Sequence, residues 1–153
     1  MANMRQRLET NGGAEARRIL LAEDNPSDAL LFQLAFTSQN LPFEIDTVPD
    51  GERLMSRLRE LAETPDRQFS LAVLDVNLPR RTAEEVLSVL DQERIKLDIP
   101  VVILSSFLSE SRQHRLRQLG VRKILTKPMD FDGYLQLATQ VASLCELAKA
   151  TTA

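Results

Sequence analysis

The chain has 153 residues, of which 43% are hydrophobic and 27% are charged, and its formal net charge is −3. This length and composition predict one globular domain with a single hydrophobic core that needs no disulfide or structural metal. The acidic total argues against a general nucleic-acid-binding protein, because such a protein needs a dense basic surface.

The rarity of cysteine and histidine excludes further kinds of site. Cys145 is the single cysteine and His114 the single histidine, too few for an intrachain disulfide or a Cys/His metal site. No apolar run approaches the length of about 20 residues that a membrane span needs, and residues 1–16 lack the apolar stretch of a secretory signal. We therefore expect a soluble, cytoplasmic chain with a mobile tail over 1–16, one domain over 17–150 and a short tail over 151–153.

Short apolar runs alternate with amphipathic runs along the whole domain. The first helix begins at Pro26 with Asn25 as its N-cap, and Leu30, Leu31, Leu34 and Ala35 form its apolar stripe. The predicted strands are 19–22, 43–48, 69–74, 100–104 and 121–125. The later helices are 50–63, 83–93, 109–119 and 130–150.

This alternation predicts a (βα)5 α/β domain, a doubly wound parallel five-stranded sheet with helices on both faces in three layers. In such a sheet the functional site lies beyond the carboxyl ends of the strands, where the strand order reverses. The residues directly after each strand are therefore the candidates for the chemistry.

Polar side chains occupy these strand ends. Glu23 and Asp24 follow the first strand, Asp75 the third, Ser105 and Ser106 the fourth, and Lys127 the fifth. Three converging carboxylates repel one another, and a Mg²⁺ ion removes that conflict. The Lys127 ammonium and the Ser105 hydroxyl suit phosphoryl oxygens. The edge therefore indicates Mg²⁺-assisted phosphoryl chemistry.

Each of these residues also has a simpler interpretation. Glu23 and Asp24 precede a helix and would offset the positive end of its dipole. Asp75 would form a turn before Leu78 and Pro79. Because four separate strand ends all carry the residue types that phosphoryl chemistry needs, their combination favours a functional site over these simpler interpretations.

Four segments make the chain resemble the receiver domain of bacterial two-component response regulators over about residues 17–148. They are ILLAEDNPSDALL, LAVLDVNLPRRTAEEVL, VVILSS and ILTKP. The motifs EDNPSD and DVNLPR look most like the small stand-alone regulators paired with phytochrome-type histidine kinases. The resemblance implies the flavodoxin-like receiver fold and a signalling role, not an enzyme.

The resemblance also implies a role for each matching residue. Asp75 would accept a phosphoryl group from a kinase histidine, and Mg²⁺ would be held by Glu23, Asp24, Asp75 and the main-chain carbonyl of Asn77. Lys127 would pair with the phosphoryl group, and Ser105 would move to hydrogen-bond it and report phosphorylation to the helix 109–119. The bond between Lys127 and Pro128 would be cis.

The chain departs from the family pattern in three places. Thr82-Ala83 stands where an Asp-Gly pair is usual, so we expect a differently shaped loop after Asp75. Ile124 replaces the switching aromatic residue, so the signal would travel through Ser105 and the backbone. Ser106 replaces a smaller residue and would narrow access to Asp75.

Phe107 and Asn77 are expected to set the lifetime of the phosphoryl group, with Phe107 shielding it from water.

Output would be interaction with another protein or with a second copy, because only one helix follows Lys127. The resemblance implies a homodimer through the helix 109–119, the strand 121–125 and the last helix. On the last helix Leu137, Val141, Leu144 and Ala148 form a second apolar stripe, which suits either this interface or burial in a wide groove. Neither DNA nor a membrane is an expected partner.

Two residues of the first helix are candidates for docking the kinase. Phe32 and Phe36 lie off the predicted core stripe of that helix. Ordinary packing in the core is the alternative interpretation.

Three other functions compete with a working receiver. A Mg²⁺-dependent aspartyl phosphatase would need a second Asp where Asn77 stands. A nucleotide-binding module would need a Gly-rich turn where Glu23 and Asp24 stand. A degenerate receiver would fold but remain unphosphorylated and act as a constitutive protein-binding module.

Overall fold

The computed structural model describes residues 17–152, with side-chain surroundings described as far as Glu146. The expected N-terminal tail, 1–16, lies outside the described residues. The strands are β1 (Arg17–Ala22), β2 (Phe43–Val48), β3 (Phe69–Asp75), β4 (Val101–Ser105) and β5 (Lys123–Thr126). The helices are α2 (Pro26–Ser38), α3 (Gly51–Glu63), α4 (Ala83–Gln92), α5 (Glu110–Gln118) and α6 (Phe131–Thr152).

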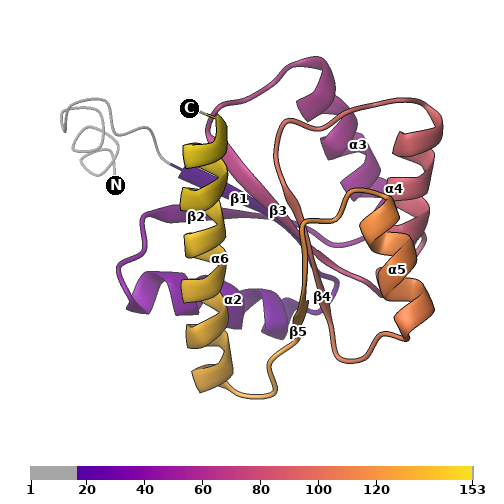
Figure 1. The fold of residues 1–153 in the computed structure, drawn as a ribbon. Helices are drawn as coiled ribbons and strands as arrows, with labels where there is room; N and C mark the ends of the chain where they lie inside the picture. Colours follow the sequence, from indigo (N-terminus) through magenta and orange to yellow (C-terminus); the bar gives the residue numbers. More distant parts are fainter. Residues whose placement is uncertain (1–16, 153) are drawn as a thin grey trace.

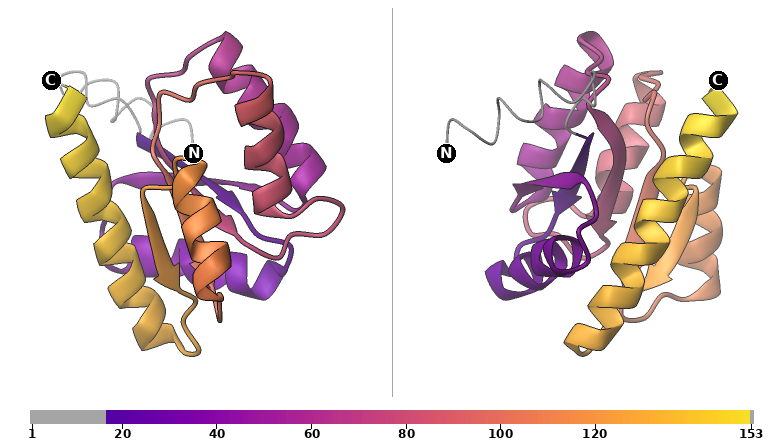
Figure 2. Two further views of the ribbon diagram at one scale, coloured as in Figure 1. Left: turned by 45° about the vertical axis from the view of Figure 1, so that its right-hand side comes forward. Right: turned by 90° about the vertical axis from the view of Figure 1, so that its left-hand side faces the viewer.

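The five strands form one parallel sheet in the order β2-β1-β3-β4-β5, as the alternating pattern predicts. Helices α2 and α6 cover one face, and α3, α4 and α5 cover the other (Figures 1 and 2). Each central strand is buried on both faces, which is why its sequence is almost continuously apolar. The predicted (βα)5 flavodoxin-like fold is confirmed.

Local signals set most of the helix starts. Asn25, Asp50, Thr82 and Ser109 each cap a helix, and each side chain accepts a hydrogen bond from a backbone N–H of the first turn. At the end of α5, Gly120 has φ of 94°, a left-handed conformation that favours glycine.

The apolar face of α2 differs from the predicted stripe. The buried residues are Ala29, Phe32, Ala35 and Phe36, while Leu30 is 54% and Leu34 is 44% exposed. Phe32 and Phe36 pack in the core with their ring centroids 5.1 Å apart. They are therefore not free to dock a kinase. Because apolar residues occur on nearly every side of α2, the larger rings take the buried side, Leu31 packs at its margin, and Leu30 and Leu34 remain outside.

Burial distinguishes the two interpretations of the second apolar stripe of α6. Leu137 and Val141 are buried against the sheet and α2, and Leu144 is partly buried. The side chain of Ala148 lies outside the described residues. This favours burial in a wide groove for the middle of the stripe.

Helix α6 runs two residues beyond the predicted domain end at 150. Lys149 and Ala150 favour helix, and neither Gly nor Pro follows to end it. Residues 151 and 152 are therefore helical, and only residue 153 of the expected tail remains outside the description. None of the described helices combines the length and apolar character that a membrane crossing requires.

Candidate functional site

The site lies at the carboxyl ends of β1 and β3, which are neighbours at the point where the strand order reverses. Glu23 and Asp24 follow β1, and Asp75 is the last residue of β3. Carboxylate oxygens of these three residues lie within 4.8 Å of one another. The structure thus brings together the three carboxylates that were predicted from their positions directly after the strands.

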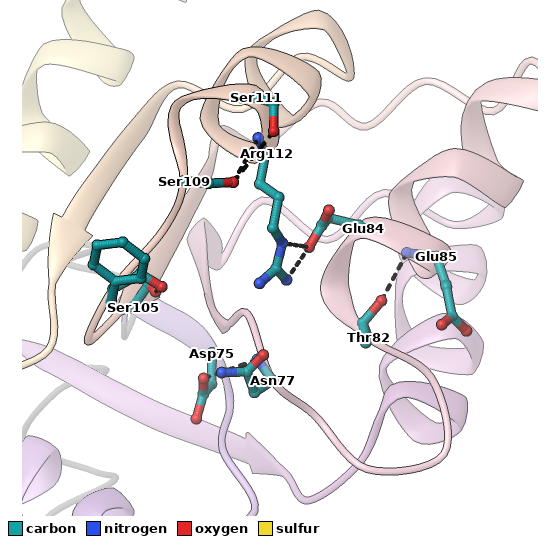
Figure 3. Close-up of polar contacts among 10 residues, drawn as sticks. Asp75, Asn77, Thr82, Glu84, Glu85, Ser105, Ser109, Ser111 and Arg112 are labelled. Atoms are coloured by element: carbon teal, nitrogen blue, oxygen red, sulfur yellow. Dashed lines mark hydrogen bonds and ion pairs between the residues drawn. The ribbon is translucent and has the colours of Figure 1, made fainter.

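Asp75 is buried, and both of its carboxylate oxygens have protein contacts. Oδ1 accepts a hydrogen bond of 3.1 Å from the backbone N–H of Asn77, shown in Figure 3. Oδ2 lies 3.0 Å from Nζ of Lys127, which follows β5. The carboxylate is therefore held in one orientation, with a positive charge beside it.

Lys127 contacts two further carboxylates. Its Nζ lies 2.6 Å from Oε1 of Glu23 and 3.0 Å from Oδ2 of Asp28. Burial disfavours its charge, but hydrogen bonds with Glu23, Asp75 and Asp28 outweigh that effect and raise the pKa of Lys127 above its ordinary value. Lys127 is therefore firmly protonated.

Asp28 is the site residue that the sequence analysis missed. It lies in the first turn of α2, and its backbone N–H donates a hydrogen bond to Oδ1 of the N-cap Asn25. The available signal was its position in the segment EDNPSD, which begins with the acidic pair and ends at Asp28.

The electrostatics of Glu23 fit a divalent cation. Burial raises the pKa of Glu23 to about 7, and the nearby Asp75 charge adds to this, while hydrogen bonds with Lys127 and the backbone N–H of Asn25 oppose it. Three crowded oxygen ligands that hold excess negative charge are the donor set that Mg²⁺ or Mn²⁺ prefers. Glu23, Asp24 and Asp75 therefore fit such a cation.

Ser105 is buried at the end of β4, but its hydroxyl is already engaged. It donates a hydrogen bond of 2.8 Å to the carbonyl oxygen of Phe107. Ser106 is exposed beside it. Ser105 would have to exchange this partner to contact a group on Asp75.

The Phe107 shield is absent from this structure. The side chain is 82% exposed, so its ring does not cover Asp75. The hydrogen bond from Ser105 holds the backbone of Phe107 against β4 while the ring faces solvent. The effect of Phe107 on the lifetime of a phosphoryl group stays a prediction, and it would require the ring to move from this position.

The expected cis bond before Pro128 is also wrong. No cis peptide bond occurs among residues 17–152, so Lys127 and Pro128 are joined in trans. A trans X–Pro bond is the intrinsically more stable form by about 0.5–1 kcal/mol, and Lys127 reaches Asp75 from it.

The loop after Asp75 accommodates Thr82-Ala83 without strain at Ala83. Thr82 caps α4 with φ of −71°, and the left-handed residue of this loop is Arg80, with φ of 69°. Ala83 is fully buried at the start of α4. The loop therefore places its left-handed turn before the position of the usual Asp-Gly pair.

A groove of about 540 Å³ runs between α4 and α5, beyond the Asn77 side of the site. Arg112 on α5 crosses it to pair with Glu84 on α4, as Figure 3 shows. The partly buried carboxylate of Glu84 raises the pKa of Arg112 further. This pair joins the elements that follow β3 and β4.

Comparison with known proteins assigns the class of protein. Residues 19–139 match the response regulator receiver domain, so the chain belongs to this family. Receiver domains are in general signalling domains, which favours that role over an aspartyl phosphatase.

Particular relatives narrow the assignment. The chain is 33% identical over 115 residues to the probable methanogenesis regulatory protein FilR2 of Methanothrix harundinacea, covering 74% of each chain. It is 29% identical over 126 residues to the response regulator Rcp1 of Synechocystis, covering 82% of this chain and 86% of Rcp1.

Solved structures give the same result. The phosphorylated cyanobacterial phytochrome response regulator RcpA matches with a TM-score of 0.68 and 32% identity, over 82% of this chain and 90% of RcpA. The Mn²⁺-bound form of Rcp1 matches with a TM-score of 0.68 and 28% identity, over 83% of this chain and 92% of Rcp1. By sequence and structure the chain is thus similar to phytochrome-associated response regulators.

Proposed function

We propose that this chain accepts a phosphoryl group on Asp75 from a sensor histidine kinase, in a reaction that needs Mg²⁺, and signals through protein–protein contacts. The observation that carries the proposal is the Asp75 carboxylate, held 3.0 Å from the Lys127 ammonium and within 4.8 Å of Glu23 and Asp24. This arrangement supplies a nucleophile, a fixed positive charge and oxygen ligands at one point.

The chemistry follows from these side chains. An oxygen of Asp75 attacks the phosphorus of a phosphohistidine, an O–P bond forms, and the N–P bond breaks with its electron pair passing to the imidazole nitrogen. Lys127 is placed to neutralise charge on a phosphoryl oxygen. A Mg²⁺ ion held by Glu23, Asp24, Asp75 and the carbonyl of Asn77 would supply further charge neutralisation.

Exposed apolar residues near the site support a protein as phosphodonor. Leu30 and Leu34 lie one turn apart on α2, and Phe107 and Met129 each follow a strand end by a few residues. Met129 is fully exposed and Phe107 is 82% exposed. Large apolar side chains in solvent are typical of an interaction surface. The likeness to Rcp1 and RcpA makes a phytochrome-type kinase, in the cytoplasm, the partner we propose.

Self-association is the second contact that we propose, through α5, β5 and α6. The buried Leu137 and Val141 contribute nothing to it, which leaves the partly buried Leu144. Sedimentation velocity at several concentrations, with and without phosphorylation, tests for a homodimer.

The phosphoacceptor is tested by the intact mass of the protein after incubation with Mg²⁺ and a small phosphoryl donor such as acetyl phosphate. We expect wild type to gain one phosphoryl mass and the Asp75→Asn variant to gain none, because its amide oxygen is a poor nucleophile. Omission of Mg²⁺ should abolish the gain. A folded wild type that gains no mass with Mg²⁺ would favour a degenerate receiver.

A further inference from the structure

All three N–H donors of the Lys127 ammonium are engaged by carboxylates. An ammonium has three N–H donors, and Nζ lies within 3.0 Å of oxygens of Glu23, Asp28 and Asp75. Two of these partners, Glu23 and Asp75, also belong with Asp24 to the group that fits a cation. Asp28 is the partner that does not.

This sharing creates a conflict between Lys127 and a divalent cation. Both positive groups seek oxygens of Glu23 and Asp75, and the contact between Lys127 and Glu23 is the shortest of the three. The Lys127 side chain is only 16% exposed, so losing its carboxylates would leave a largely buried charge unpaired. A partner outside the cation group resolves the conflict.

Asp28 is placed to be that partner. Its Oδ2 lies 3.0 Å from Nζ, and its side chain is 28% exposed and lies in the first turn of α2. The Asn25 cap, which accepts from the backbone N–H of Ser27 and Asp28, fixes this turn. The position of the Asp28 carboxylate is thus set by the helix and is independent of any cation.

We propose that Asp28 is a positioning residue that retains Lys127 at the site when Glu23 and Asp75 bind a divalent cation. The inference deepens the proposed function and rests on it, because it requires the acidic group to bind Mg²⁺. A simpler role for Asp28, offsetting the helix dipole of α2, would affect stability but not cation affinity.

Tyr134 offers a readout of this arrangement. Its side chain is 3% exposed, and its hydroxyl is buried without a hydrogen-bond partner among the described residues. Burial raises the pKa of Tyr134 to about 12, and Asp28 exerts the largest effect of any charged group on it. Since the chain has one tyrosine and no tryptophan, tyrosine fluorescence comes from this position alone.

The first experiment is a Mg²⁺ titration of the full chain, followed by calorimetry and by Tyr134 fluorescence. The variants are Asp28→Asn, which keeps the size of the side chain but removes its charge, and Asp91→Asn as a matched control. Asp91 is exposed on α4, and replacing it with Asn changes the net charge by the same amount as Asp28→Asn. We expect Asp28→Asn to weaken Mg²⁺ binding about five- to tenfold, and Asp91→Asn to stay within about twofold of wild type.

A double-mutant cycle shows whether Asp28 acts through Lys127. In a Lys127→Ala background the loss caused by Asp28→Asn should shrink to less than about twofold. If Asp28→Asn weakened Mg²⁺ binding by the full factor in the Lys127→Ala background, the proposal would be overturned. The Asp28 charge would then act on the cation directly and not through Lys127. Asp28→Glu, which restores the charge, should recover most of the affinity.

The outcomes separate the inference from the proposed function. Wild type that fails to bind Mg²⁺ overturns both. Wild type that binds, with Asp28→Asn equal to the Asp91→Asn control, overturns the positioning role alone. Urea unfolding of each variant establishes that it is folded, and Asp28→Ser, which preserves a good residue for the first turn, replaces Asp28→Asn if that variant does not fold.

Discussion

The hydroxyl of Ser105 is 2.8 Å from the carbonyl oxygen of Phe107, and this contact defines what a switch at this residue requires. To bond a phosphoryl group on Asp75, Ser105 must release Phe107. The released backbone lies just before Ser109, the N-cap of α5. We therefore expect a change at this hydroxyl to be transmitted to the start of α5, without the aromatic side chain that Ile124 replaces.

Cys145 carries a prediction about stability at high pH. It is 1% exposed, and burial raises the pKa of its thiol to about 12, with Arg17 opposing and Glu146 adding to the shift. Above an ordinary thiol pKa of about 8.5 the unfolded chain loses this proton while the folded chain keeps it. The unfolded state is then favoured, so this contribution to stability is present below that pH and is lost as the pH rises toward 12.

We expect the free energy of unfolding to fall by roughly 1–2 kcal/mol between pH 8 and 10 because of Cys145. Urea unfolding of wild type and Cys145→Ala across this range measures it. The variant should show a shallower pH dependence, whatever its stability at pH 7. If the free energy of unfolding fell equally with pH in both proteins, Cys145 would not be the cause of the loss.

At the scale of the elements, the start of α3 is packed against the loop that follows β3. The backbone N–H of Gly51 donates to the carbonyl of Pro79 over 3.1 Å. A Cβ on Gly51 would lie 2.0 Å from the carbonyl oxygen of Arg81. Because the obstructing atom belongs to the backbone, the helix and the loop must move apart to admit any side chain.

We therefore expect Gly51→Ala to destabilise the protein by roughly 1–3 kcal/mol or more. Gly120→Ala is the matched control, because its Cβ meets nothing within 4 Å and only its φ of 94° is unfavourable. That strain costs about 1–2 kcal/mol. Thermal unfolding of both variants tests the ranking, and a smaller loss for Gly51→Ala would show that the loop yields easily.

The orientation of α2 shows that the sequence of a helix does not always determine which of its faces is buried. Its N-cap and its first residue follow from Asn25 and Pro26, and both are confirmed. Its buried face was predicted wrongly for Leu30 and Leu34, because the helix offers apolar residues on several sides. The choice is made by β2 and α6, where Phe36 meets Phe43 edge-on and Gln39 bonds the carbonyl of Leu135.

At the scale of the molecule, the exposed leucines lie on α2, the helix that directly follows Glu23 and Asp24 of the site. Leu30 lies in the second turn of α2, and Leu34 lies one turn further along the helix. If they dock the kinase, replacing both with Ser should slow phosphotransfer from a phytochrome-type kinase about tenfold or more, since apolar anchors dominate interface energies.

The same double variant should react normally with a small phosphoryl donor, because both leucine side chains face solvent and the polar contacts of Asp75 and Lys127 are made by other residues. Rapid-quench phosphotransfer and intact mass measure the two rates. Equal slowing with both donors would mean that the substitutions disturb the site itself, and no slowing with the kinase would remove the docking role.

The sequence by itself determined the sheet and most of the site. Apolar strands that alternate with helices allow few topologies, and a parallel sheet brings Glu23, Asp24, Asp75, Ser105 and Lys127 to one edge. These residues are readable because each directly follows a strand that its own local pattern identifies.

Only the tertiary structure decided the features that depend on contacts between distant segments. The buried side of α2, the burial of Leu137 and Val141 and the solvent-facing ring of Phe107 are of this kind. The contact between Asp28 and Lys127 is also of this kind. The fold brings Asp28 on α2 and Lys127 after β5 to within 3.0 Å of each other. Local periodicity cannot supply them, because they are set by the shapes and charges of residues that meet only after the chain has folded.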